Sequence, residues 1–223
     1  MPDKQDIAVA VWPQGLRSFS IDLDPGVRCG VVSDARMMAE EAVTPVQTHS
    51  CNVALISSGH GGLPCLDDTD SLVCMRRGVR IGVRTADCVP VVIYAPDIAA
   101  VAAVHAGWRG TLGGIVDRTL DRLAALGADP GVMKVAFGPS VCGRCYEVDA
   151  ELAARFARAG FEDAVAGSRH VDLEEVNRMR LVSAGVRSCN VRGKDFCTLE
   201  TQWLPSWRRS RDNTRLLTWI ELA

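Results

Sequence analysis

The feature that most constrains the fold of this chain is a series of nine short apolar runs that are rich in β-branched residues. Runs of this length and composition are typical of β-strands. A chain with this many strands needs at least one large sheet. The expected strands are Ile7–Trp12, Arg28–Val32, Asn52–Ile56, Ser71–Met75, Arg80–Arg84, Pro90–Tyr94, Ala100–Val104, Met133–Phe137 and Arg215–Glu221.

Three segments have the apolar spacing of amphipathic helices. The clearest is Leu112–Leu126, where apolar residues recur every three or four positions before Gly127. Two others are Asp149–Ala159 and Leu173–Ala184, and Asp172 is a capping residue for the last. Because single helices alternate with groups of strands, without a βαβ repeat, we expect an α/β (α+β) fold, a layered sandwich of mixed β-sheets flanked by helices.

Two segments are irregular and rich in glycine, proline and polar residues. They are Ser57–Thr69 and Arg192–Arg211, and both are expected to be loops rather than linkers between domains. The chain has 223 residues, of which 48% are hydrophobic, and this is enough for a sizeable core. We therefore expect residues 1–223 to form a single domain.

The charge and hydropathy of the chain exclude several classes of partner. Its net charge is −2, with 25 basic and 27 acidic residues, and this balance does not favour binding to nucleic acid or anionic lipid. No stretch approaches the roughly 18 apolar residues of a membrane span, and no secretory signal opens the sequence. A cytoplasmic protein is expected, either a monomer or a homodimer.

The nine cysteines do not suggest a disulfide framework, because their number is odd and the chain is not small. Cysteines inside apolar runs, such as Cys29, Cys74 and Cys189, are expected to act as small core residues. Cys142 and Cys145 have the C-x-x-C spacing of a zinc or redox motif. Without a second pair nearby, we interpret them as two reduced thiols that line a glycine-proline loop.

Three residues stand where strands meet polar turns and carry metal-binding side chains. His105 ends one apolar strand, Cys88 follows another strand and precedes a third, and His49 lies just before Asn52–Ile56. Two imidazoles and a thiolate form a catalytic zinc set that leaves one coordination position open. Their separations of 39 and 17 residues (49 to 88, 88 to 105) match no compact motif, so core histidines and a buried thiol remain an alternative.

The two other histidines, His60 and His170, lie in polar surroundings and are expected to be solvated rather than to bind metal. Asp87 is either a turn-capping carboxylate or a group that orients Cys88. Arg109 is either a surface arginine or a clamp for an anion.

Several segments resemble the YfiH family, the laccase-domain proteins also called polyphenol oxidases and purine nucleoside phosphorylases. The resemblance extends from Gln47 onward and implies that His49, Cys88 and His105 bind the metal. Its motifs are TADCVPV (85–91), AVHAGWRGTLGGI (103–115), GPSVCGRCYEV (138–148), VDLEEVNRMRLVSAGV (171–186) and Cys197-Thr198. The family's arginine-rich segments are matched only loosely, around Arg28 and at Ser206–Arg209, and Arg215 stands where a Gly-Arg pair is usual.

The resemblance implies a zinc-dependent purine nucleoside phosphorylase that acts on adenosine, inosine and methylthioadenosine-type substrates, with adenosine deaminase activity. Its catalytic residues would be His49, Cys88 and His105, which would hold the Zn²⁺ that activates water or polarises a substrate atom. Among the candidate substrate contacts, Arg109 and Arg28 would hold phosphate or ribose oxygens. Gln47 and Asp87 would support the site.

The sequence is also compatible with three other functions. The first is a copper-dependent polyphenol oxidase, since Cu²⁺ suits the same nitrogen and sulfur donors. Two remaining histidines are too few for a trinuclear copper cluster, which argues against a complete multicopper oxidase. The second is a non-catalytic accessory protein, either zinc-stabilised or related to peptidoglycan. The third is a cysteine hydrolase with Cys88 as nucleophile and His105 as base.

Overall fold

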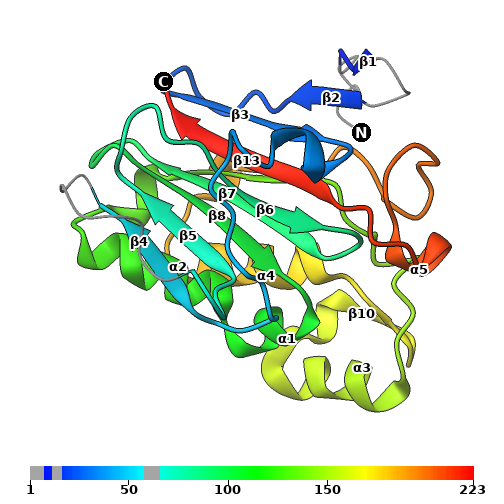
Figure 1. Cartoon of the computed structure of the whole chain (residues 1–223). Coiled ribbons are helices and arrows are strands. Elements are labelled where there is room, and N and C mark those ends of the chain that lie inside the picture. The colour runs from blue at the N-terminus through cyan, green and yellow to red at the C-terminus, as the bar shows by residue number, and fades with distance from the viewer. Residues whose placement is uncertain (1–7, 12–16, 58–65) are drawn as a thin grey trace.

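The computed structural model describes residues 8–11, 17–57 and 66–223. Its centre is a six-stranded mixed sheet in the order β12-β9-β7-β8-β5-β4 (Figure 1). The outer pairs β12·β9 and β4·β5 are parallel, and the inner pairs are antiparallel. The strands are β4 (Val53–Ile56), β5 (Ser71–Cys74), β7 (Val89–Ala95), β8 (Ala100–Ala106), β9 (Lys134–Phe137) and β12 (Val191–Arg192).

A second sheet of five antiparallel strands lies over one face of the first, in the order β1-β2-β3-β13-β6. β13, drawn in red in Figure 1, therefore lies between two strands from much earlier in the chain. The strands are β1 (Ala10–Val11), β2 (Arg17–Ser20), β3 (Val27–Val32), β6 (Ile81–Thr85) and β13 (Leu216–Leu222). A separate hairpin joins β10 (Val165–Ala166) to β11 (His170–Val171).

Helices cover the other face of the six-stranded sheet. The α-helices are α1 (Trp108–Gly113), α2 (Ile115–Ala125), α3 (Ala150–Phe156), α4 (Leu173–Ser183) and α5 (Trp207–Ser210). Short helical turns are η2 (Ala35–Met38), η3 (Pro130–Val132), η4 (Ala157–Phe161), η5 (Glu162–Ala164) and η6 (Ser188–Asn190). No described helix combines the length and apolar character that crossing a bilayer requires.

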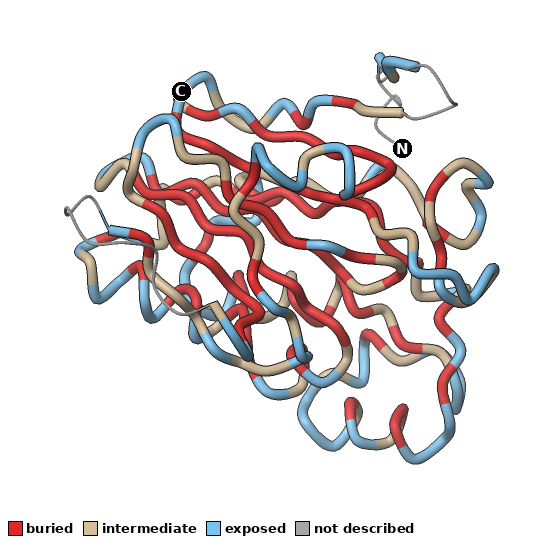
Figure 2. The backbone as a smooth tube through the Cα atoms, viewed as in Figure 1, coloured by how far each residue is buried: buried red, intermediate tan, exposed pale blue. Residues whose placement is uncertain are grey.

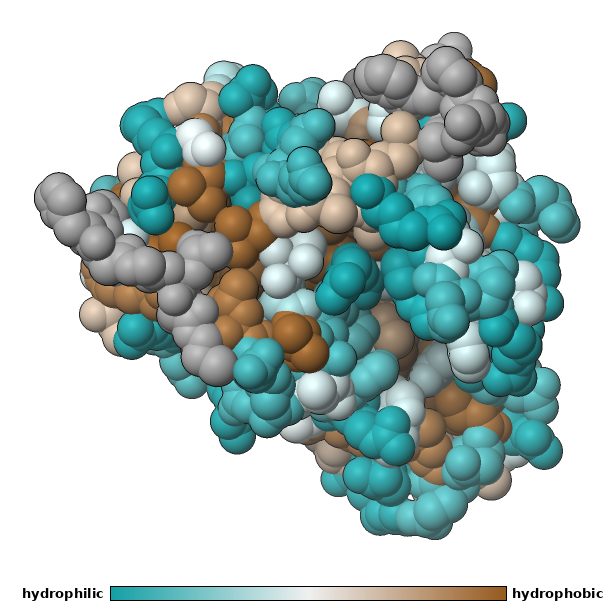
Figure 3. All heavy atoms as spheres, viewed as in Figure 1, coloured by the Kyte–Doolittle hydropathy of each residue, from teal (hydrophilic) through white to brown (hydrophobic). Residues whose placement is uncertain are grey.

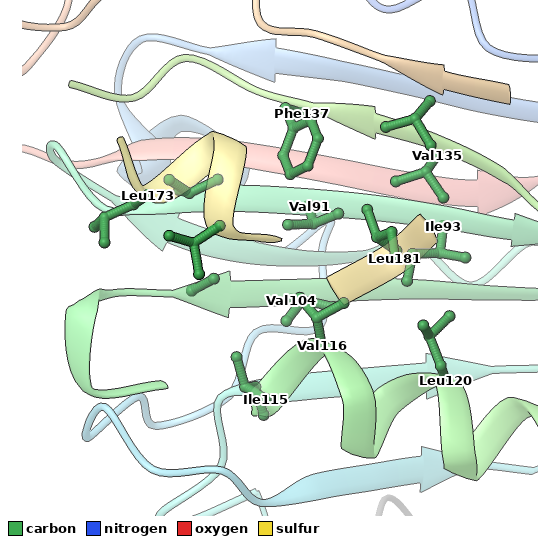
Figure 4. Close-up of a cluster of buried hydrophobic side chains, with 14 of the residues drawn as sticks. Val91, Ile93, Val104, Ile115, Val116, Leu120, Val135, Phe137, Leu173 and Leu181 are labelled. Carbon is green, nitrogen blue, oxygen red and sulfur yellow. The ribbon is translucent and has the colours of Figure 1, made fainter. Parts of the chain in front are cut away.

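Successive side chains of the central strands point to opposite faces of the six-stranded sheet and therefore belong to two different cores. In β7, Val91 and Ile93 face the helices, where they pack with Val116 and Leu181 (Figure 4). The intervening Val92 belongs to the core between the two sheets. All seven residues of β7 and of β8 are buried, as expected for strands covered on both faces, and Figure 2 shows them as a continuous red band.

The expected layered α/β sandwich is confirmed, although several element boundaries differ. The helix expected over Leu112–Leu126 is two helices, because Gly114 adopts a left-handed conformation with φ of 80° between α1 and α2. The helix expected over Asp149–Ala159 is shorter, because Asp149 is the N-cap of α3 and regular α-helix ends at Phe156. The strand β2 was not expected from Arg17–Ser20, whose residues are mostly polar, and α5 lies inside the segment expected to be a loop.

Candidate metal centre

Strand pairing brings Cys88 and His105 together. β7 and β8 are antiparallel with Pro90 opposite His105 and Val89 opposite Ala106. Cys88 directly precedes this ladder, so its thiol lies at the start of β7, next to the end of β8 that carries the imidazole of His105. His105 is almost fully buried, and Cys88 is partly buried.

Asp70, a residue without an assigned role in the sequence analysis, orients His105. Ser71 pairs with Val104, so Asp70 lies beside His105. The backbone N–H of His105 donates to the Asp70 carbonyl at 2.8 Å, and His105 Nδ1 donates to Asp70 Oδ1 at 2.5 Å. A proton held on Nδ1 leaves the lone pair of Nε2 available to a metal, as in the carboxylate-histidine pairs that support zinc sites.

The same carboxylate fixes the backbone of the segment that carries His49. The N–H groups of Thr48 and Ser50 donate to Asp70 Oδ2 at 3.1 and 2.7 Å, and that of His49 donates to Oδ1 at 3.1 Å. His49 adopts a positive φ of 64°, which is uncommon for a residue with a side chain. The buried Asp70 therefore holds two of the three candidate ligands in place.

The three candidate ligands meet at one point. One ligand atom of each residue lies within 4.8 Å of the others. Cys88 Sγ is 3.9 Å from His49 Nε2, and the two imidazole centroids are 4.9 Å apart. Zinc bonds of about 2.0–2.3 Å in tetrahedral geometry place ligand atoms roughly 3.3–3.8 Å apart, so this donor set fits one ion after small movements.

Gly107 leaves the space that this arrangement needs. A Cβ atom at Gly107 would lie 2.8 Å from His49 Cδ2 and 3.0 Å from Cys88 Sγ. Both distances are too short for ordinary contacts. The glycine after His-Ala is thus required by the close approach of the imidazole and the thiol.

The pKa values of Cys88, His105 and Asp70 depend on one another. Burial opposes the thiolate of Cys88, but the charge of His105 and hydrogen bonds from both histidines prevail and lower the pKa of Cys88 to about 6. Burial likewise opposes an imidazolium at His105, yet Cys88 and Asp70 raise the pKa of His105 to about 9. Burial disfavours the Asp70 carboxylate, while His105 and Ser50 lower the pKa of Asp70 to about 2.

Gln47 and Asp87 support the ligands through other contacts. Gln47 Nε2 donates to the Arg84 carbonyl, and the Arg84 N–H donates to Gln47 Oε1, both at 2.8 Å. The carboxylate of Asp87 accepts from Thr198 Oγ1 at 2.7 Å and from the Arg208 N–H at 2.8 Å. These contacts anchor the residues next to His49 and Cys88.

A pocket of about 440 Å³ opens beside the three ligands. It is bordered by the guanidinium-bearing residues Arg84 and Arg215 and by the partly exposed ring of Trp207. Hydrophilic residues dominate the side of the molecule where α5 lies (Figure 3). The remaining lining residues are Val46, Gln47, Thr85, Ala86 and the three candidate ligands.

The two arginines expected to hold substrate lie elsewhere. Arg28 on β3 forms an ion pair with Glu221 at 2.5 Å, at the end of β13 remote from Arg215, and its side chain is 66% exposed. Arg109 is exposed and stacks over the ring of Trp108 at 4.3 Å. Neither borders the pocket. His170 lies in β11, and His60 falls outside the described residues.

Arg84 and Arg215 reach the pocket through the pairing of β6 with β13. Leu217 lies opposite Arg84 and Leu216 opposite Thr85, so Arg215 emerges beside the end of β6. Asp70, like the two arginines, lies near a strand end, directly before the buried strand β5. None of these three roles follows from the sequence without the strand order.

A protein-family model described as multi-copper polyphenol oxidoreductase laccase matches residues 28–223 of this chain. Adenosine deaminase RL5, from an unknown prokaryotic organism, is 37% identical over 201 residues, covering 84% of this chain and 74% of RL5. A purine nucleoside phosphorylase of Aquifex aeolicus is 33% identical and covers 93% of this chain and 95% of its own. One from Deinococcus radiodurans is 38% identical over 158 residues, 70% of this chain and 61% of that protein.

Solved structures share the fold. YfiH of Bacillus licheniformis superposes with a TM-score of 0.82 at 23% identity, covering 92% of this chain and 96% of that chain. YlmD of Geobacillus stearothermophilus gives a TM-score of 0.79 at 22% identity, covering 97% and 99%. From the family-model match and these relatives, the chain belongs to the YfiH family of laccase-like proteins.

Proposed function

We propose that this protein is a zinc-dependent purine nucleoside phosphorylase that also deaminates adenosine. The observation that carries the proposal is the meeting of His49, Cys88 and His105 at a pocket that also presents Arg84 and Arg215. The names of the relatives, adenosine deaminase and purine nucleoside phosphorylase, supply the reaction classes.

The donor atoms for zinc would be Cys88 Sγ and the imidazole nitrogens of His49 and His105, with Nδ1 of His105 engaged by Asp70. A zinc ion with an open position supplies Lewis acidity and lowers the pKa of a bound water. The role of Asp70 is to keep the proton of His105 on Nδ1.

Phosphorolysis would use the arginines of the pocket. Phosphate attacks the anomeric carbon, the bond from that carbon to the purine nitrogen breaks, and the products are a free base and a pentose 1-phosphate. Arg84 and Arg215 offer the planar donors that bind phosphate, and the exposed ring of Trp207 offers a surface on which a purine can stack. In deamination, water replaces the exocyclic amine of adenosine and ammonia leaves.

The direct test is turnover of adenosine and inosine with and without inorganic phosphate. Release of adenine or hypoxanthine with ribose 1-phosphate, dependent on phosphate, supports phosphorolysis, and inosine with ammonia supports deamination. Cys88→Ala should abolish both activities together with the zinc at this site. Cys189→Ala should leave both activities and this zinc intact, because the Cys189 thiol is exposed and, contrary to expectation, does not belong to the core. Unchanged metal content and turnover in Cys88→Ala would refute the proposal.

A second candidate is copper-dependent oxidation of phenols, which the description of the family model favours. Copper accepts the same nitrogen and sulfur donors. Among the described residues, the two groups of metal-binding side chains include only one with histidines, which leaves no set for a trinuclear copper cluster. Oxygen uptake with a phenol by the copper-loaded protein, without nucleoside turnover by the zinc-loaded protein, would favour this candidate.

A further inference from the structure

A second group of metal-binding side chains lies apart from the first. Cys142 and Cys145 follow β9, and the chain brings Cys197 and Glu200 to them from more than fifty positions away. One ligand atom from each of the four lies within 4.8 Å of the others. The expectation of two thiols lining a loop thus misses a third thiol and a carboxylate.

The backbone on both sides holds these side chains toward one another. The N–H groups of Cys145 and Tyr146 both donate to the Cys142 carbonyl at 2.9 Å, which folds this segment into a tight turn. The Thr201 N–H donates to the Cys197 carbonyl at 2.9 Å, which turns Glu200 back toward Cys197. Hydrogen bonds within each turn therefore hold Cys142 near Cys145, and Cys197 near Glu200, without a bound metal.

Contacts between the two turns fix their relative position. The Thr198 N–H donates to the Ser140 carbonyl at 3.1 Å, and Ser140 and Cys197 form a parallel bridge. The N–H of Cys142 donates to Cys197 Sγ at 3.4 Å, a contact that favours a thiolate. Gly143 is needed in the first turn because a Cβ there would lie 2.6 Å from Asp172 Cβ.

We propose that Cys142, Cys145, Cys197 and Glu200 bind a zinc ion with structural function. Zinc–sulfur bonds of about 2.3 Å in a tetrahedron place sulfurs about 3.8 Å apart, so the four groups need to close by only a small distance. The thiols release their protons to solvent as they bind. Four protein ligands fill the coordination shell, as in structural rather than catalytic zinc sites.

Arg144 balances the charge of such a site. Its guanidinium donates to both carboxylate oxygens of Glu200 at 3.0 Å. Three thiolates and a carboxylate around Zn²⁺ carry two excess negative charges, and the arginine between the two cysteines of the first turn compensates one of them. Oε1 of Glu200 accepts two hydrogen bonds from Arg144, whereas Oε2 accepts one and keeps a further lone pair for the metal.

The proposed ion would clamp the turn after β9 to the segment of Thr198. Thr198 is fully buried, and its hydroxyl donates to Asp87, the neighbour of Cys88. Arg209 Nη1 donates to the Thr198 carbonyl at 2.8 Å, which links the clamp to α5 at the edge of the pocket. A metal at the second site would thereby stabilise the position of Asp87 and α5 beside the first site, without contacting the substrate.

The test is zinc content per folded chain, measured by elemental analysis of protein purified without chelator or added metal. Wild type should carry two equivalents, Cys145→Ser one, Cys88→Ser one, and the double variant none. The exposed Cys189→Ser is the matched control and should keep both. Because stoichiometry is measured without a substrate, failure here leaves the proposed function untouched.

A second measurement covers the case in which Cys145→Ser does not fold. Cobalt added to the metal-free Cys88→Ser protein should give an intense thiolate-to-cobalt absorption, which Glu200→Gln shifts and weakens. No such absorption, or full zinc content in Cys145→Ser, overturns the proposal. A disulfide among Cys142, Cys145 and Cys197 in freshly isolated protein, found by mass spectrometry after alkylation, overturns it as well.

Discussion

Nδ1 of His105 donates a hydrogen bond to Oδ1 of Asp70 at 2.5 Å, between the ends of adjacent strands β8 and β5. Asp70 is completely buried and also receives three backbone N–H groups from the segment of His49. A single carboxylate thus joins two ligands that are far apart in sequence, and its charge is stabilised by every group that contacts it.

Asp70→Asn should weaken zinc binding by about 10–100-fold, because the amide no longer supports the Nδ1–H tautomer of His105 with a negative charge. Competition with a chromophoric chelator measures the affinity. Asp67→Asn makes the same charge change at an exposed position of the same loop and should leave the affinity unchanged. Equal affinities for Asp70→Asn and wild type would show that the carboxylate has no part in binding.

Removal of the metal should leave Cys88 as a reactive thiolate. Since its pKa is lowered to about 6, the thiolate fraction, and with it the rate of alkylation by iodoacetamide, should rise through pH 6 and level off by about pH 7–8. Added zinc should protect the thiol. Buried Cys29, whose pKa is raised to about 12 by burial, should stay unmodified in the folded protein. A midpoint of the Cys88 profile near pH 8.5, the value of an ordinary thiol, would contradict this interpretation.

Gly107→Ala should impair the site without unfolding the chain. The φ of Gly107 is −73°, which alanine adopts freely, so the damage comes from the contacts with His49 and Cys88. A displacement of about 1 Å at a reacting centre can reduce kcat/KM by about 100-fold. Circular dichroism and steady-state kinetics separate the two effects. Gly131→Ala, at a surface turn away from the ligands, serves as the control and should show wild-type kinetics.

Arg215→Ala should raise the KM for phosphate by about 10–100-fold, the effect expected from the loss of charge-assisted hydrogen bonds worth 1.5–3 kcal/mol. Arg84→Ala should act in the same direction because both residues border the pocket. Arg109→Ala removes an equal charge outside the pocket and should leave this KM unchanged. If Arg109→Ala has the larger effect, phosphate does not bind between Arg84 and Arg215.

The sequence predicts the parts of this molecule that depend on local pattern. The buried strands β5, β7 and β8 stand out because both faces are covered, and capping residues mark where α3 and α4 begin. The helical spacing continues through Gly114, however, and a single left-handed residue separates α1 from α2 without a change in the apolar pattern.

The parts that depend on strand order are not predictable in this way. The three candidate ligands stand out because each lies at a strand end, but Arg28 and Arg215 are both arginines near strand ends and look equally suitable. The pairing of β13 decides between them, because Glu221 lies opposite Arg28 whereas Arg215 lies next to the end of β6. The same reasoning applies to Cys197 and Glu200, which only the folded chain brings to Cys142.

The place of β13 between β3 and β6 also orders events during biosynthesis. Residues 49–105 carry all three candidate ligands and the neighbouring strands that align them, whereas Arg215 and Leu216–Leu222 leave the ribosome later. Pairings between distant segments form slowly, since the chain must first lose the freedom of the loop between them. A nascent chain can therefore gather its ligands and capture an ion before it has a pocket in which a substrate fits.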